Sequence, residues 1–166
     1  MDSGEGAMAS PDDLRLLVRA IALAREARQS GNHPFGALLA DPDGVVLAEA
    51  MNTVETDRDP TGHAELNLIR ESARLGPDIL THATLYSSTE PCAMCAGGIY
   101  WAGIGRVVYA LAESELLAFT GSDRRNPTLA LPSRNVFAAG NRPIDVCGPV
   151  ELPEARDVQR GFWKGR

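Results

Sequence analysis

The stretch HATLYSSTEPCAMCAGGIYWAGIGRVVYAL, residues 82–111, predicts a strand, a helix and a second strand in succession. HATLYSST and RVVYAL read as strands, and PCAMCAGGIYWAG between them has the length of a helix. Cys92 and Cys95 stand at the start of that helix, three residues apart. This spacing fits a thiol-disulfide exchange pair, half of a structural zinc site, or two ligands of a catalytic metal.

The sequence before this stretch predicts a helix, a hairpin and a second helix. SPDDLRLLVRAIALAREARQSGN (10–32) has Ser10 as a helix cap and Pro11 in the first turn. Its predicted apolar face consists of Leu14, Leu17, Val18 and Ile21. PFGALLADPDGVVLAEAMN (34–52) has the pattern of a hairpin, and TGHAELNLIRESARLG (61–76) that of a helix.

The sequence after this stretch continues the alternation. SELLAF (114–119) predicts a short helix, residues 121–135 a loop, RPIDVCGPV (142–150) a last strand, and LPEARDVQRGFWKGR (152–166) a closing helix. Cys147 is expected as a small buried residue of that strand. Helices interleaved with strands indicate an α/β sandwich with parallel pairing of the later strands. We expect a disordered tail at residues 1–10 and a single domain at 11–166.

Composition narrows the class of protein. The chain has 166 residues, 44% hydrophobic and 23% charged, as in a globular domain, and no apolar run long enough to cross a membrane. The acidic N-terminus lacks the apolar segment of a signal peptide. Three cysteines argue against a disulfide framework and for a cytoplasmic setting. The net charge of −6 argues against a protein that grips a phosphate backbone.

The histidines decide which interpretation of Cys92 and Cys95 we favour. A structural zinc site needs a second close pair of ligands, and the chain has only His33, His63 and His82, of which the first and last are expected to be bystanders. His63 and Glu65 lie at the start of the helix predicted over 61–76. We expect the two helix starts side by side, so that three ligands leave one zinc position for water. Glu65 would then accept and pass on the proton of the zinc-bound water.

His-x-Glu followed by Pro-Cys-x-x-Cys is the signature of zinc deaminases. The segments PFGALL, MNTVETDRDPTGHAELNLIR and ATLYSSTEPCAMCAGGIYWAGIGRVVYA resemble the cytidine deaminase-like superfamily, in particular its guanine deaminase, cytosine deaminase and tRNA adenosine deaminase branch. The resemblance extends from about Leu14 to Ala112. It implies a three-layer α/β/α sandwich with a central five-stranded mixed sheet, and a homodimer.

The resemblance also implies a site. His63, Cys92 and Cys95 correspond to the ligands of one Zn²⁺ per chain with a bound catalytic water, and Glu65 to the proton shuttle.

For substrate binding, Asn52 resembles the asparagine that hydrogen-bonds the base, the backbone of Ala64 a further base contact, and Phe35 a pocket wall. Glu113 and Glu115 lie where guanine deaminases place an acid, and counting from Tyr109 selects Glu115.

The substrate stays open at this point. We expect a guanine- or cytosine-type nucleobase or nucleoside, with tRNA adenosine deamination as the alternative. Cations gather only around Arg124 and Arg125 and in RGFWKGR (160–166), so nucleic acid is not expected as a partner. Phe162 and Trp163 resemble an aromatic tail that some base deaminases fold over the pocket, or they dock the last helix. A thiol-disulfide oxidoreductase is a remote alternative that leaves His63 and Glu65 unexplained.

Overall fold

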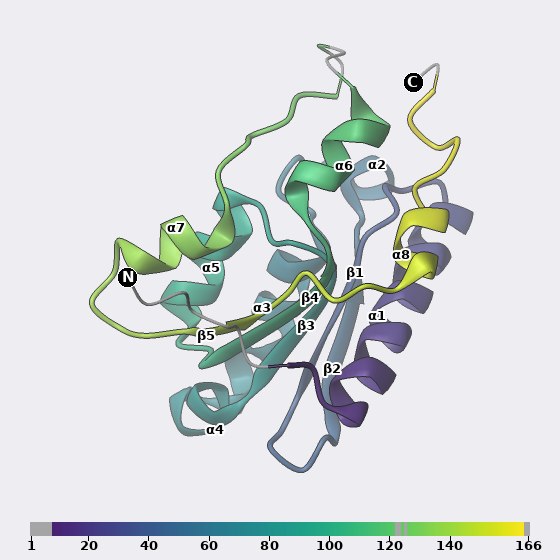
Figure 1. The fold of residues 1–166 in the computed structure, drawn as a ribbon. Coiled ribbons are helices and arrows are strands. Elements are labelled where there is room, and N and C mark those ends of the chain that lie inside the picture. Colours follow the sequence, from purple (N-terminus) through teal and green to yellow (C-terminus); the bar gives the residue numbers. More distant parts are fainter. Residues whose placement is uncertain (1–7, 122–123, 125, 165–166) are drawn as a thin grey trace.

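Five strands form one mixed sheet in the computed structural model, which describes residues 8–121, 124 and 126–164 (Figure 1). The strands are β1 (Gly36–Ala40), β2 (Val46–Met51), β3 (Thr84–Thr89), β4 (Arg106–Leu111) and β5 (Asp145–Cys147), in the order β2-β1-β3-β4-β5. Strand β1 is antiparallel to both β2 and β3, whereas β3–β4 and β4–β5 are parallel. The predicted five-stranded mixed sheet and its parallel later strands are confirmed.

Helices cover both faces of the sheet, which gives three layers (Figure 1). Helix α1 and the short α8 pack on one face, and α3, α5 and α7 on the other, each side with its own apolar core. The helices are α1 (Pro11–Gln29), α2 (Val54–Asp57), α3 (Ala64–Ser72), α4 (Pro77–His82), α5 (Ala93–Ala102), α6 (Glu113–Thr120), α7 (Ser133–Ala138) and α8 (Pro153–Asp157), with a 3-10 turn at Ala73–Leu75. No described helix is long and apolar enough to span a bilayer.

Helix α1 begins where the sequence predicts. The Ser10 hydroxyl accepts a hydrogen bond from the Asp13 N–H at 3.1 Å, and the Asp13 carboxylate accepts one from the Ser10 N–H at 2.8 Å. The predicted apolar face is wrong in half of its members, because Leu14 is 39% and Val18 51% exposed. The buried stripe is instead rich in small residues and consists of Leu16, Leu17, Ala20, Ile21, Leu23, Ala24 and Ala27.

The small residues of α1 let it approach β1 closely. A Cβ atom on Gly36 would clash with the backbone of Ala20 and Ala24. The glycine of PFGALL therefore serves helix-sheet packing. This packing fixes the position of Phe35, the residue just before the strand.

The C-terminal third differs most from prediction. Residues 121–135 are not all loop, since α7 begins at Ser133, and the expected helix over 152–166 ends at Asp157. The Arg28 guanidinium donates to the carbonyl oxygens of Val158 and Arg160, and Gly161 adopts a φ of +71°, so the chain turns back instead of continuing as a helix. Residues 1–7 of the expected tail, Arg125 and residues 165–166 lie outside the described part of the chain.

Candidate active site

The two predicted helix starts meet at one edge of the sheet. His63 is the N-cap residue of α3, which follows β2, and Cys92 is the N-cap residue of α5, which follows β3. The strands β2 and β3 are not neighbours in the sheet, because β1 lies between them. Because both strands are antiparallel to β1, they still point the same way, and their carboxyl ends reach the same edge.

Three side chains converge there. The Nδ1 atom of His63 lies 3.6 Å from the Cys92 sulfur and 3.5 Å from the Cys95 sulfur. Among the described residues no fourth His, Cys, Asp or Glu joins this group, whose donor atoms lie within 4.8 Å of one another. The group therefore lacks the fourth protein ligand of a structural zinc site.

This donor set fits zinc. Ordinary Zn–N and Zn–S bond lengths in a tetrahedron would place nitrogen and sulfur about 3.5 Å apart, close to the two distances observed. None of the three cysteines forms a disulfide. An exchange pair has no need of a histidine nitrogen beside both sulfurs, so the geometry favours a metal over thiol-disulfide chemistry.

Hydrogen bonding prepares one of the thiols for metal binding. The Cys95 thiol and His63 together lower the pKa of Cys92 to about 4, against the opposing effect of burial. The same interaction with Cys92, together with burial, raises the pKa of Cys95 well above its usual range. The hydrogen bond with Cys92 also raises the pKa of His63.

Glu65 lies beside the group and is only 5% exposed. Its Oε1 atom accepts a hydrogen bond from the Ser87 hydroxyl at 2.8 Å, and its Oε2 atom lies 3.4 Å from the Cys95 sulfur. Burial raises the pKa of this carboxyl, and the charge of Cys92 adds to the effect. A carboxyl group held in this way is suited to accepting and returning a proton near neutral pH.

A cavity of about 420 Å³ opens onto these residues. His63, Glu65 and Cys92 line it, and Phe35 and Trp163 form an aromatic wall. Because Trp163 lines the cavity, the structure agrees with the prediction of an aromatic tail near the pocket. His33 also lines the cavity, contrary to its expected role as a bystander, because its neighbour Pro34 turns the chain into β1 next to the site.

Asn52 and Ala64 lie fully buried near this end of the sheet. The Oδ1 atom of Asn52 accepts a hydrogen bond from the Val54 N–H at 3.1 Å, whereas its Nδ2 atom has no partner among the described residues. Ala64 is the first residue of α3, so its N–H lies in the turn that has no acceptor within the helix. Asn52 thus acts as a turn residue and keeps one buried donor unused.

The two candidate acids at the start of α6, Glu113 and Glu115, lie in different surroundings. Arg156 binds the carboxylate of Glu115 at 2.6 Å, and Glu115 does not line the cavity. Glu113 lines the cavity instead. Burial and the charges of Cys92 and Glu90 raise its pKa to about 7.

Two further polar groups in the cavity wall were not predicted. Thr89, the last residue of β3, is 3% exposed and its hydroxyl has no hydrogen-bond partner among the described residues. The Nδ2 atom of Asn126 is likewise buried without a described partner. Buried polar groups are rarely left unpaired, so these atoms are suited to contacting a bound molecule. Neither residue belongs to a motif that sequence patterns could reveal.

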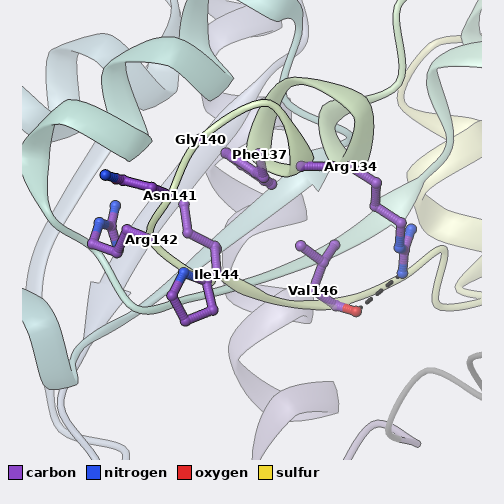
Figure 2. A pocket seen from close by; sticks show the side chains of 9 residues that line it. Arg134, Phe137, Gly140, Asn141, Arg142, Ile144 and Val146 are labelled. Carbon is purple, nitrogen blue, oxygen red and sulfur yellow. Dashed lines mark hydrogen bonds between the residues drawn. The ribbon is translucent and has the colours of Figure 1, made fainter.

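A second hollow, of about 500 Å³, lies between α7 and β5 (Figure 2). Its two arginines already bind backbone oxygens: Arg134 donates to Val146 and Gly148, and Arg142 to Ile104 and Tyr100. No histidine, cysteine or acid lines it. This hollow has no group for acid-base or metal chemistry.

Comparison with known proteins agrees with this geometry. The family described as "Cytidine and deoxycytidylate deaminase zinc-binding region" matches residues 10–111, which include His63, Glu65, Cys92 and Cys95. The chain belongs to this deaminase family. It therefore shares the zinc-binding region that defines the family, and its His/Cys/Cys group is suited to one Zn²⁺.

Individual deaminases are also similar to this chain. The chain is 40% identical to a probable cytosine deaminase of Schizosaccharomyces pombe over 94% of its own length and 95% of the relative's. It is 45% identical to a guanine deaminase of Bacillus subtilis over 60% of this chain and 64% of that one. A solved structure from a study of tRNA:A34 deaminases is 29% identical, with a TM-score of 0.68 over 87% of this chain and 99% of that one.

Proposed function

We propose that this protein is a zinc-dependent hydrolase that deaminates a small aminated nucleobase or nucleoside of the guanine or cytosine type. The observation that carries the proposal is the juxtaposition of the His63, Cys92 and Cys95 donors with the buried Glu65 carboxyl beside one cavity, which His63, Cys92 and Glu65 line. The names of the relatives from S. pombe and B. subtilis support the choice of substrate class.

In this proposal His63, Cys92 and Cys95 hold the zinc. Such an ion, when bound by three protein ligands, lowers the pKa of a coordinated water to about 7 and thereby supplies the nucleophile. Glu65 accepts one proton of the attacking water and gives it to the ring nitrogen, and then carries the second proton, from the newly added hydroxyl group, to the departing amine. The water oxygen forms a bond to the ring carbon, the bond from that carbon to the exocyclic amine breaks, and ammonia leaves. Ser87 orients the carboxyl throughout.

Cavity groups would recognise the base. Phe35 lines the cavity and packs against the ring face. Asn52 and Ala64 do not line the cavity, and we propose that the unused Nδ2 of Asn52 and the Ala64 N–H donate to ring acceptors when substrate is bound. Glu113 takes the role first assigned to Glu115, because it is the glutamate of that helix that lines the cavity. Thr89 is placed to add a further contact.

Deamination of adenosine in tRNA is the competing substrate assignment, since a tRNA:A34 deaminase structure shares the fold. The net charge of −6 favours the small substrate. Binding that neutralises several phosphates weakens by orders of magnitude between low and moderate salt, whereas binding of a neutral base does not.

The experiment is an ammonia-release screen of zinc-loaded protein against guanine, cytosine, adenine, their nucleosides and a tRNA anticodon stem-loop, each across a salt series. We expect turnover of a free base or nucleoside that is nearly independent of salt. Salt-sensitive conversion of the RNA alone would contradict the proposal and favour the tRNA assignment.

We further propose a homodimer that works in the cytoplasm. The exposure of Trp101, 85% of whose surface is open on α5, supports a subunit interface. The lack of a disulfide among the three cysteines supports a reducing compartment. Analytical ultracentrifugation of the wild type and of Trp101→Lys tests the interface, and a monomeric wild type would refute it.

A further inference from the structure

The last residues of the chain are tied to the active-site cavity through one buried amide. Gln159 lies just after α8 and is fully buried. Its Nε2 atom donates a hydrogen bond to the carbonyl oxygen of Pro34 at 2.8 Å. Its Oε1 atom accepts a hydrogen bond from the indole N–H of Trp163 at 2.9 Å. One side chain therefore connects two segments that are far apart in the sequence.

Both connected segments form walls of the cavity. Pro34 stands between His33 and Phe35, and these two residues line the cavity together with Trp163. The indole ring of Trp163 lies 5.2 Å from the ring of His33 and 6.0 Å from that of Phe35, centroid to centroid. The aromatic wall (His33, Phe35 and Trp163) is thus assembled from the segment before β1 and the segment after α8.

Apolar contact alone does not define the position of this wall. Ring contacts at these distances tolerate sliding, whereas a hydrogen bond requires a particular direction and length. The amide of Gln159 is matched to its partners, because Pro34 offers only an acceptor and the indole of Trp163 only a donor. A leucine at this position would leave both groups buried and unpaired.

We propose that Gln159 is a positioning residue that fixes Trp163 against His33 and Phe35 and so sets the shape in which the cavity binds its substrate. The proposal rests on the deaminase function proposed above. Gln159 does not line the cavity and lies apart from the zinc ligands and Glu65, so its role is in binding and not in proton transfer.

Fluorescence tests the position of Trp163 without any substrate. The chain has two tryptophans, and Trp101 is exposed, so the Trp101→Phe protein reports Trp163 alone. Adding Gln159→Leu should shift the emission to the red and increase quenching by iodide, because the indole loses its partner and becomes exposed. Gln29→Leu in the same background is the matched control, since Gln29 is an exposed residue at the end of α1.

Kinetics on whichever base the wild type deaminates give the second readout. Gln159→Leu should raise KM about tenfold, the effect of leaving a buried polar group unpaired, with kcat nearly unchanged and the zinc content intact. Trp163→Phe keeps the ring but removes the N–H, and should raise KM in the same direction by less. It carries the kinetic test if Gln159→Leu does not fold.

An unchanged KM in the folded variants, or a fall in kcat at constant KM, would overturn the positioning role. A wild type that deaminates none of the compounds would instead refute the proposed function. In that case the emission of Trp163 still decides whether Gln159 holds it, and unchanged emission would overturn the proposal.

Discussion

Replacing Glu65 with glutamine removes the proton carrier while keeping the shape of a side chain that is only 5% exposed. The amide oxygen of the variant can still accept the hydrogen bond that Ser87 donates at 2.8 Å. We therefore expect the fold and the zinc content to be unchanged. General acid-base steps contribute about 10²- to 10⁴-fold, equal to a barrier increase of about 3 to 5 kcal/mol, and kcat should fall by this amount.

Glu90 also lines the cavity, but its carboxylate accepts hydrogen bonds from the backbone N–H groups of Glu113 and Ser133 and is not free to replace Glu65. Ammonia release measures kcat, and elemental analysis measures zinc. Glu71→Gln, an exposed change on the same helix, is the control. Turnover within a few-fold of wild type at full zinc content would remove Glu65 from the mechanism.

Four further substitutions have defined outcomes. Cys92→Ser or His63→Ala should lose zinc and activity together, and stoichiometric zinc in either variant by elemental analysis would refute the ligand assignment. Asn52→Asp keeps an acceptor for the Val54 N–H but removes the unused donor. Substrate affinity should fall about 5- to 150-fold at constant zinc, and unchanged binding in calorimetry would leave Asn52 as a turn residue. Asp13→Asn should destabilise the fold by about 3 kcal/mol at pH 7, because it breaks the bidentate pair of this buried carboxylate with Arg106.

The Asp13 effect has a definite pH dependence. Burial raises the pKa of Asp13, but hydrogen bonds from Arg106, Ser10 and Tyr86 outweigh it and hold the pKa well below its usual range. A lowered folded-state pKa contributes stability that is complete above the unfolded pKa of about 3.9 and is lost as the pH falls below it. Thermal unfolding of wild type and variant should therefore converge as the pH drops below 4. A gap that stays constant to pH 3 would contradict the ion-pair explanation.

The sequence predicted the parts of the fold that depend on local signals. Ser10 and Asp13 cap α1 through backbone contacts within one turn, and the strands around Cys92 have strong apolar patterns. The apolar face of α1 was misjudged because its alanines, which look neutral in a pattern, bury against β1. The C-terminal segment was misjudged because Arg28, more than a hundred residues away, binds the carbonyl oxygens that a longer helix would use.

The residues of the candidate site also fall into those that local sequence motifs reveal and those that only the folded structure reveals. His63, Glu65, Cys92 and Cys95 lie in short motifs whose spacing implies chemistry, and the structure brings them together. Counting along the chain selected Glu115 over Glu113, because it does not reveal which side chain in the first turn of a helix faces the cavity. Thr89, Asn126 and Gln159 have no motif, and their importance appears only as hydrogen bonds made or missing in three dimensions.

The residues that line the active-site cavity come partly from the segment that matches the deaminase family and partly from the chain after it. The family match ends at residue 111 and includes His63, Glu65 and Cys92, whereas Glu113, Leu116, Asn126, Leu129 and Trp163 of the cavity lining all follow it. Substitutions after residue 111 can therefore change part of the cavity wall while the zinc ligands and Glu65 stay the same. For the same reason, a mutant library confined to residues 112–164 is the place to search for variants that accept other aminated heterocycles.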